Sequence, residues 1–357
     1  MTLKFYSISC GDAACIEFSD KSGAGRCVLI DAGYERTFRE VLFSEIMRIQ
    51  SEVGQIDLWV ISHIHDDHIG GAISYFKAVT RKEIPDIVSN WGFNPISKVR
   101  STIDTPDSGM SQPTSYNQGI VLEAYLSSNG KLPVMDITFG SMLYNSFDLE
   151  IQILSPRIEV LSSLRKKYAE SDKKITDYRV SEVAGSILND YSKTIDSFDI
   201  GNSVEDTSLE NESSITFITT LNDRKVLWLA DAPSNTIVRS LKELGYSETN
   251  PLKVDLVKVS HHGSNANNSL ELYGMIRCRK YVFCSDGENK YQLPTKECIA
   301  TILRSNQRMP DEQYEIIFTC RSQSLQNLFA SDGEEVYERW NFKTTFPTVN
   351  LWVEVSL

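Results

Sequence analysis

Short apolar runs separated by turn-forming residues fill the N-terminal third of the chain. Residues 56–62 form a near-continuous apolar run, as expected for a strand that is covered on both faces. Residues 37–49 instead carry apolar side chains at helical spacing, and the run at 56–62 leads into a predicted loop at 63–71 and a predicted helix at 72–79. Strands are predicted at 3–8, 14–18, 27–30 and 56–62.

Strands and helices are predicted again from residue 149, and from residue 214 the chain repeats the order of strands, a helix and a polar loop. Helices are predicted at 158–168, 235–244 and 295–304, and strands at 149–154, 214–220, 225–230, 254–259, 280–284, 315–319 and 350–355. Asn222 and Asp223 form the turn of a predicted hairpin. Two β-rich halves with helices outside them predict stacked sheets flanked by helices, an α/β (or α+β) fold.

Two stretches fit this order poorly. Residues 91–147 hold loop-like and polar segments around a candidate helix at 118–126, and residues 170–212 are polar and rich in Ser and Asp. We therefore expect one domain over residues 1–357, with irregular insertions near 91–147 and 170–212, the second being its most mobile or irregular part.

The composition narrows the class of protein. Lys and Arg number 36 against 48 Asp and Glu, so the net charge is −12, which argues against a nucleic-acid coat or a membrane-surface binder. No run approaches the ~18 apolar residues of a membrane span, and the start lacks the features of a signal peptide. The seven cysteines form no Cys-x-x-Cys pair, so we expect reduced thiols in a cytoplasmic protein.

The five histidines of the chain fall into two tight clusters, each directly after a predicted buried strand. They are His63, His65 and His68 in the first cluster, and His261 and His262 in the second. His63 and His65 are two residues apart, so an extended backbone points both rings to one side, where they can hold a cation. Asp67 and His68 follow the turn and can face a second cation about 3.5–4 Å away.

This combination of imidazole and carboxylate suits zinc, with manganese or iron as alternatives. There are two non-catalytic alternatives. The histidines could form a hydrogen-bonded cluster without a metal, or they could bind a single structural zinc. Three histidines and an aspartate within six residues, 63–68, favour a metal centre over both.

A known family shares these residues. The segment His63-x-His65-x-Asp67-His68 matches the signature of the metallo-β-lactamase fold hydrolases. Asp31 resembles the family's strand-end aspartate that braces the histidine loop, and Asp231 resembles the aspartate that bridges two metals.

Together with residues 10–14, 211–215 and 258–264, these segments resemble the soluble hydrolase domain of ComEC-type competence proteins and their stand-alone relatives. The resemblance implies a four-layer αββα fold and two divalent metal ions. His261 and His262 lie in what resembles the last metal-ligand loop. Adjacent extended positions cannot aim both rings at one point, so we expect His261 to bind metal and His262 to protonate the leaving group. The expected metal ligands are His63, His65, Asp67, His68, Asp231 and His261, and the expected catalytic residues are Asp67 and His262.

Two departures from the family pattern affect this expectation. No histidine lies between His68 and Asp231, so Asn211 becomes a candidate neighbour of the first metal. Leu293 stands where the ComEC pattern commonly has a histidine before proline, and His262 or Lys290 would have to take over its role.

The sequence therefore predicts a di-metal hydrolase that uses a metal-bound hydroxide on a phosphodiester, as a nuclease or nucleotide phosphodiesterase. The expected substrate is a nucleotide or a nucleic-acid end, and no membrane partner is expected. One alternative is a lactone or thioester hydrolase on the same fold, because fold does not choose the substrate. The other is a non-catalytic interaction module that is stabilised by its metal.

Overall fold

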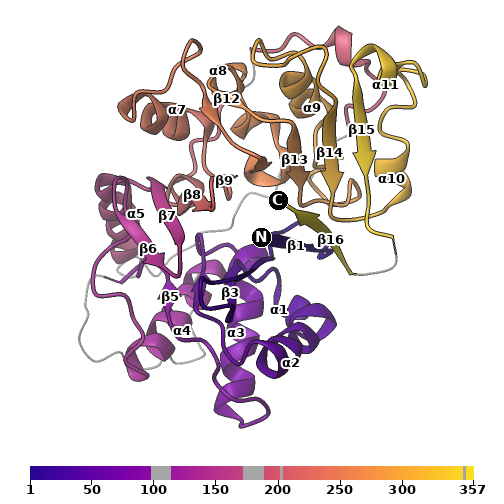
Figure 1. Ribbon diagram of the computed structural model, residues 1–357. Helices are drawn as coiled ribbons and strands as arrows, with labels where there is room; N and C mark the ends of the chain where they lie inside the picture. Colours follow the sequence, from indigo (N-terminus) through magenta and orange to yellow (C-terminus); the bar gives the residue numbers. More distant parts are fainter. Residues whose placement is uncertain (98–113, 172–188, 202–203, 349–350) are drawn as a thin grey trace.

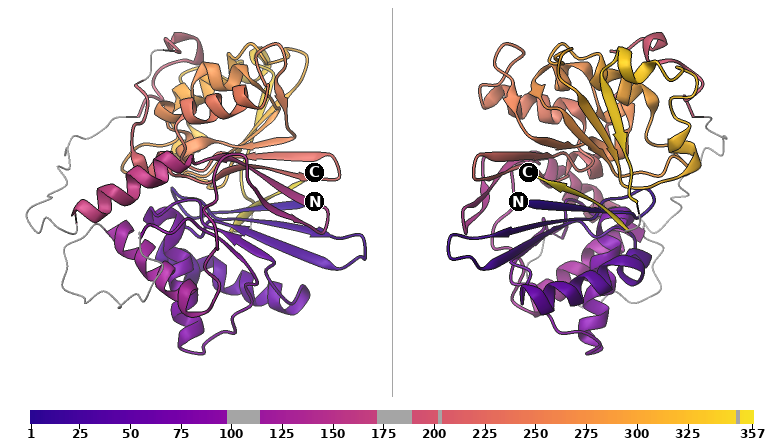
Figure 2. Two further views of the ribbon diagram at one scale, coloured as in Figure 1. Left: turned by 90° about the vertical axis from the view of Figure 1, so that its left-hand side faces the viewer. Right: turned by 45° about the vertical axis from the view of Figure 1, so that its right-hand side comes forward.

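The computed structural model describes residues 1–97, 114–171, 189–201, 204–348 and 351–357. Within these residues the chain forms two large β-sheets that stack face to face, with helices on both outer faces (Figures 1 and 2). The four-layer αββα arrangement expected from the sequence is confirmed. The ends of the chain meet, because the first and last strands pair along their length, from Thr2 opposite Ser356 to Tyr6 opposite Trp352.

The first sheet combines an antiparallel and a parallel part. Its strand order is β16 (Trp352–Ser356), β1 (Thr2–Tyr6), β2 (Ala14–Ser19), β3 (Gly25–Ile30), β4 (Leu58–Val60) and β5 (Trp91–Gly92). The pairs β3–β4 and β4–β5 are parallel, so the carboxyl ends of β3 and β4 lie at the same edge of the sheet.

The second sheet is larger and is parallel in its C-terminal part. Its order is β15 (Phe342–Thr345), β14 (Tyr314–Phe318), β13 (Lys280–Phe283), β11 (Leu256–Lys258), β9 (Arg224–Trp228), β8 (Thr216–Leu221), β7 (Leu149–Ser155) and β6 (Met142–Ser146). The hairpin between β8 and β9 turns at Asn222 and Asp223, as predicted, and both residues have positive φ angles, 49° and 64°. A separate parallel pair joins β10 (Leu252–Lys253) to β12 (Ile276–Arg277).

Helices cover the outer face of each sheet. On the first sheet lie α1 (Glu35–Thr37), the π-helix η1 (Phe38–Leu42), α2 (Phe43–Glu52), α3 (Asp66–Thr80), α4 (Thr114–Ser128) and α5 (Ile158–Ser171). On the second lie α7 (Ser234–Glu243), α8 (Leu270–Gly274), α9 (Lys296–Leu303), α10 (Gln323–Gln326) and α11 (Val336–Arg339). Among the described residues, no helix is both long and apolar enough to cross a lipid bilayer.

Three clusters of buried apolar side chains follow from this layering. One lies between the first sheet and its helices, one between the second sheet and its helices, and one between the two sheets. The inter-sheet cluster includes Phe5 and Val28 from the first sheet and Phe217, Trp228 and Val282 from the second. Six of the seven cysteines are buried and all seven are free, as expected.

The structure corrects several predicted boundaries. Helix α3 begins at Asp66 rather than at residue 72, because Gly70 and Gly71 lie inside the helix instead of ending the loop. The helix predicted at 118–126 extends over Thr114–Ser128, and the one predicted at 37–49 is divided into α1, η1 and α2.

The predicted insertion at 170–212 lies partly outside the described residues, which omit 172–188 and 202–203. Its described part contains only short helices, η2 (Ile195–Ser197) and α6 (Leu209–Glu212). Even so, Tyr191, Ile195 and Phe198 are buried in the core beneath the helices of the second sheet.

Candidate metal centre

The first histidine cluster lies where β4 ends and α3 begins. The Asp31 carboxylate, at the end of the adjacent β3, accepts hydrogen bonds from the Ser62 backbone amide (2.7 Å) and from the Ser62 hydroxyl (2.8 Å). His68 Nδ1 lies 2.9 Å from the same carboxylate. Asp31 therefore braces the histidine loop, as the sequence suggested, and leaves His68 Nε2 free to face the site.

Two glycines let α3 approach this loop closely. A Cβ atom on Gly71 would lie 2.1 Å from the carbonyl oxygen of Ala32, and one on Gly70 would lie 2.5 Å from the Glu35 amide nitrogen. Any side chain would therefore push the helix away from the segment that follows Asp31.

Asp231 lies between the two histidine clusters. It follows β9, is 1% exposed, and has atoms near rings from both clusters. His68 Nε2 lies 3.3 Å from Asp231 Oδ1, and His63 Nε2 lies 3.8 Å from Asp231 Oδ2. The structure thus brings the first cluster together with the aspartate that the sequence proposed as a bridge.

The second cluster has a backbone that the sequence did not predict. His261 and His262 lie in the 3-10 helix η3 (Ser260–Gly263) and both have positive φ angles, 45° and 54°, so the assumption of an extended backbone is wrong. The Nε2 atoms of the two rings lie 3.7 and 3.6 Å from Asp231 Oδ2. Adjacent residues can therefore both face the site.

The two rings differ in burial and in their partners. His262 is 1% exposed, and its Nε2 lies 3.0 Å from Asp67 Oδ2. The side chain of His261 is 28% exposed, and its Nδ1 lies 2.8 Å from the side-chain oxygen of Asn267. Asp206 accepts a hydrogen bond from Asn267 and lies 3.6 Å from His261 Nδ1.

The structure shows which contacts the other candidates from the sequence make. Asn211 is buried and donates to Asp206, which connects it to the partners of His261. Leu293 is buried, and its carbonyl accepts hydrogen bonds from Gly287, Ser285 and Asn289 within its own loop. The Lys290 side chain extends over the Tyr291 ring, with Nζ 4.7 Å from the ring centroid.

Burial and charge act differently on the histidines. Burial lowers the pKa of His63 and of His65, which favours the neutral rings that can donate a lone pair. Burial also opposes protonation of His68, but the carboxylates of Asp231 and Asp31 raise its pKa well above the usual value. Buried negative charge thus surrounds His68, and positive charge is favourable at this point.

The donor atoms fit a metal ion. Within the described parts of the chain, His63 Nε2, His68 Nε2 and Asp231 Oδ1 are buried without a hydrogen-bond partner, a costly state unless something else binds them. Two groups offer ligand atoms that all lie within 4.8 Å of one another: Asp12, His68, Asp231 and His262 in one, and His63, His65 and Asp231 in the other. Imidazole nitrogen and carboxylate oxygen are ligands that zinc and similar cations prefer.

The four-layer fold and this cluster of donor atoms at the strand ends are those of a metal-dependent enzyme. Residues 18–80, from β2 to the end of α3, match the family described as "Metallo-beta-lactamase superfamily". This segment contains Asp31 and the first histidine cluster.

Two solved structures resemble the chain more distantly. Zn²⁺-bound PqqB from Methylobacterium extorquens shares 9% identity at a TM-score of 0.42, with complete coverage of both chains. A mutant of the CmlA β-hydroxylase shares 13% identity at a TM-score of 0.39, and the chain covers 54% of its length. No curated protein shows significant similarity to the sequence. At these identities neither structure informs the chemistry of this chain.

Sequence reasoning missed four polar residues of the centre or its surroundings, or left their role open. Asp206 and Asn267 carry no motif, whereas Asp12 and Lys258 lie in segments that resemble the family but had no role assigned. A signal did exist for Lys258, because a lysine in an apolar strand next to a histidine pair is unusual.

Proposed function

We propose that this protein is a di-metal hydrolase that cleaves phosphodiesters, as its resemblance to ComEC-type hydrolases suggests. The observation that carries the proposal is the pair of buried donor groups that share Asp231. Two cations held on a common carboxylate suit displacement at phosphorus, because they can balance charge on both the attacking and the leaving oxygen.

The geometry supports an assignment of residues to each cation. His63, His65 and Asp231 form the first group, and His68, Asp231 and His262, with Asp12 beside them, form the second. We assign Asp67 to the second cation as well, because its Oδ2 lies 3.0 Å from His262 Nε2. Zinc is the proposed metal, with manganese or iron as alternatives. This assignment exchanges the roles that the sequence suggested for His261 and His262, because His262 is the more buried ring and contacts Asp67.

When bound, the cations supply a water molecule acidified toward neutrality and stabilise developing negative charge. The chain's own residues orient the reactants. The Asp67 carboxylate accepts a hydrogen bond from the attacking water and holds it in line with the substrate. The partly exposed His261 ring, held by Asn267, donates a proton to the leaving oxygen.

The net charge narrows the substrate. At −12 the protein repels long polyanions, so a nucleotide or a short single-stranded end suits it better than a long duplex. Hydrolysis of a lactone or a thioester does not need a second cation to balance charge on the leaving group. Both substrates are therefore included in the experiment as alternatives.

The experiment reconstitutes the protein with zinc or manganese and measures turnover of bis(4-nitrophenyl) phosphate, a short single-stranded oligonucleotide, a lactone and a thioester. We expect turnover of the first two. Asp231→Asn should lower it about 10²–10³-fold, as loss of several kcal/mol of charge stabilisation implies.

The matched control is Asp255→Asn. Asp255 lies at the opposite end of β11, where it accepts a hydrogen bond from the Lys225 amide, so activity should be unchanged. Turnover of the lactone or thioester alone would replace the phosphodiester proposal. Two bound metals with no turnover of any substrate would support a non-catalytic module.

A further inference from the structure

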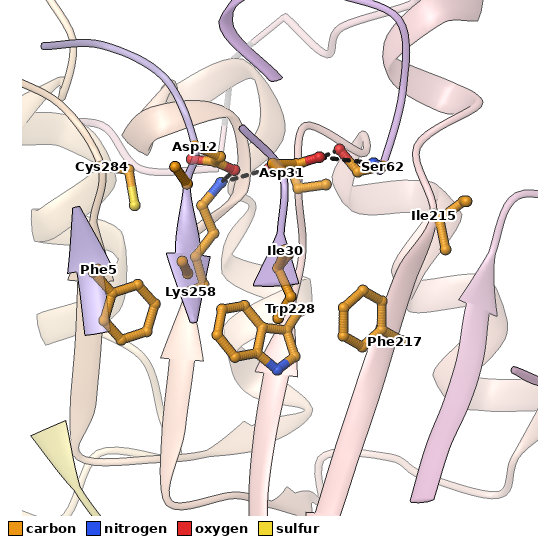
Figure 3. A pocket seen from close by; sticks show the side chains of 13 residues that line it. Phe5, Asp12, Ile30, Asp31, Ser62, Ile215, Phe217, Trp228, Lys258 and Cys284 are labelled. Carbon is orange, nitrogen blue, oxygen red and sulfur yellow. Dashed lines mark hydrogen bonds and ion pairs between the residues drawn. The ribbon is translucent and has the colours of Figure 1, made fainter. Parts of the chain in front are cut away.

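A lysine lies almost completely buried beneath the metal centre. Lys258 is the last residue of β11 and is 3% exposed. Its carbon chain runs between the two sheets, past Trp228 and Phe5, and its ammonium group reaches the carboxyl edge of the strands (Figure 3). Burying a lysine is costly unless its charge is paired, so its position calls for a role.

Among the described residues the ammonium group contacts a carboxylate and a backbone carbonyl, and both belong to the site. It forms an ion pair with the Asp12 carboxylate and donates a hydrogen bond of 3.1 Å to the Ala230 carbonyl. The same carbonyl accepts from the His261 amide at 2.8 Å. Ala230 has a positive φ of 42° and directly precedes Asp231, so Lys258 holds the backbone that presents the shared carboxylate.

Asp12 in turn lies behind His262. Its Oδ1 is 3.3 Å from His262 Nδ1, and neither atom has a hydrogen-bond partner among the described residues. A small rotation of the ring lets Nδ1–H donate to this carboxylate, which leaves Nε2 facing Asp67 and Asp231. The Asp12 backbone amide also donates to the Asp67 carbonyl at 3.0 Å, so this residue connects the two halves of the site.

Distance alone would also allow Asp12 to bind a cation, because it belongs to the donor group that it forms with His68, Asp231 and His262. The ammonium group of Lys258 already occupies its other oxygen. A carboxylate paired in this way is a weak metal ligand but a good hydrogen-bond acceptor for an imidazole.

We propose that Lys258 is a positioning residue: its ammonium group holds Asp12 behind His262, so that Asp12 orients the imidazole toward the second cation instead of binding that cation itself. This inference rests on the proposed di-metal site. The ammonium group of Lys258 would then act as a built-in cation, which holds Asp12 in place before any metal binds.

The test measures zinc affinity by competition with a chromogenic chelator, in the full-length protein. Lys258→Met keeps the length of the side chain without its charge, and Asp12→Asn keeps the shape without the anion. Each should weaken one of two zinc equivalents about 10–100-fold, the usual effect of removing a group that orients a metal ligand. Both residues act through the same contacts. The zinc affinity of the double variant should therefore equal, within about twofold, that of the single variant with the lower affinity.

A spectroscopic readout separates positioning from general destabilisation. In the zinc-loaded wild type, the ¹⁵N spectrum of the histidine rings should show His262 protonated at Nδ1, and this signature should be lost or broadened in both single variants. Lys258→Arg keeps the charge and should retain most of the zinc affinity.

Lys296→Met is the matched control. Lys296, the first residue of α9, is another fully buried lysine, which pairs with Asp332 and donates to the carbonyl of Lys193 at 2.6 Å. Lys296→Met should destabilise the fold and leave both zinc affinities unchanged. If Lys258→Met also destabilises the fold without changing either zinc affinity, Lys258 is only structural and the inference is wrong.

If Lys258→Met does not fold, Asp12→Asn and the double variant still decide, because removing both charges leaves no unpaired buried ion. Unchanged zinc affinity in Asp12→Asn would overturn the inference. A wild type that binds no zinc would instead overturn the proposed di-metal site.

Discussion

Residues with positive φ angles surround the metal centre at the ends of its strands. Asp31, Ala230, His261 and His262 have φ angles of 54°, 42°, 45° and 54°. None is glycine, so each conformation costs about 1 kcal/mol or more and persists only where its surroundings hold it. Here the backbone turns sharply after each strand, which is how side chains from separate strands point at Asp231.

The pair of adjacent histidines gives the first prediction at this scale. His262→Ala should weaken the second zinc equivalent at least about a hundredfold, because it removes a buried ring that faces Asp67 and Asp231. His261→Ala should keep both metals and lower turnover about 10²–10⁴-fold, as loss of a general acid does. Elemental analysis and phosphodiester turnover on the same samples check both. Zinc loss in His261→Ala with zinc retained in His262→Ala would restore the assignment that the sequence suggested.

A second residue-scale prediction concerns the glycines of α3. Gly71→Ala should destabilise the protein by about 1–3 kcal/mol, although alanine is the better helix former, because its Cβ would lie 2.1 Å from the Ala32 carbonyl oxygen. The control is Gly25→Ala, whose Cβ would have an ordinary 3.7 Å contact with Val53. It should stay within about 0.5 kcal/mol of the wild type in chemical denaturation. Equal stability of the two variants would show that α3 can shift freely.

At the scale of elements, the sequence predicted strands better than helix boundaries. Alternation and apolar runs located most strands to within a few residues, because burial on one or both faces imposes these patterns. The start of α3 was missed because two glycines usually mark a loop, whereas here they allow a helix to touch a neighbouring backbone.

The same contrast applies to the site. Its histidines could be found because their spacing is local, and Asp231 could be found because its segment resembles a family motif. Asp206, Asn267 and Lys258 could not be assigned, because their roles depend on contacts between distant segments, such as that of Lys258 with Asp12.

The packing of α2 on the first sheet supports a prediction about pH. The buried Glu45 accepts hydrogen bonds from Lys4 (3.1 Å), Tyr6 (3.0 Å) and Arg48 (2.7 Å). Burial would raise the pKa of Glu45, but Arg48 and Lys4 hold it below the ordinary 4.5. A depressed pKa stabilises the fold above about pH 4.5, and this contribution is lost as the pH falls through the lower value.

Glu45→Gln should therefore cost about 1–3 kcal/mol at pH 7, and the difference from the wild type should shrink at pH values below 4.5. Glu52 is a matched control, because it pairs with the same Arg48 but its side chain is 59% exposed. Glu52→Gln should change the free energy of unfolding by less than about 0.5 kcal/mol. Urea denaturation at pH 7 and at a pH below 4.5 measures these differences. A loss of unfolding free energy in Glu45→Gln that is the same at both pH values would contradict the charge argument.

At the scale of the whole molecule, the two halves of the sequence share one interior. The last strand, β16, returns to pair with β1, and the cluster between the sheets draws side chains from both halves. The metal centre is divided in the same way, with the first histidine cluster from one half and Asp231 with the second cluster from the other. A single domain over residues 1–357 stays a prediction, and the shared interior is the physical reason for it.

Trp228 tests this expectation, because it lies where the sheets meet. Its ring stacks on Phe5 of the first sheet, with centroids 5.5 Å apart, and on Phe217 of its own sheet at 6.1 Å. Trp228→Ala should cost about 3–5 kcal/mol, as truncation of a buried tryptophan does. If the halves unfold as one unit, native-state hydrogen exchange should show the same loss of protection in β2 and β3 of the first sheet as in β13 and β14 of the second. Trp228→Phe keeps an aromatic ring between the sheets, so it should lose clearly less protection from hydrogen exchange in both sheets. Loss of protection confined to the second sheet would mean that the halves are separately stable, and the metal centre would then lie at an interface between two domains.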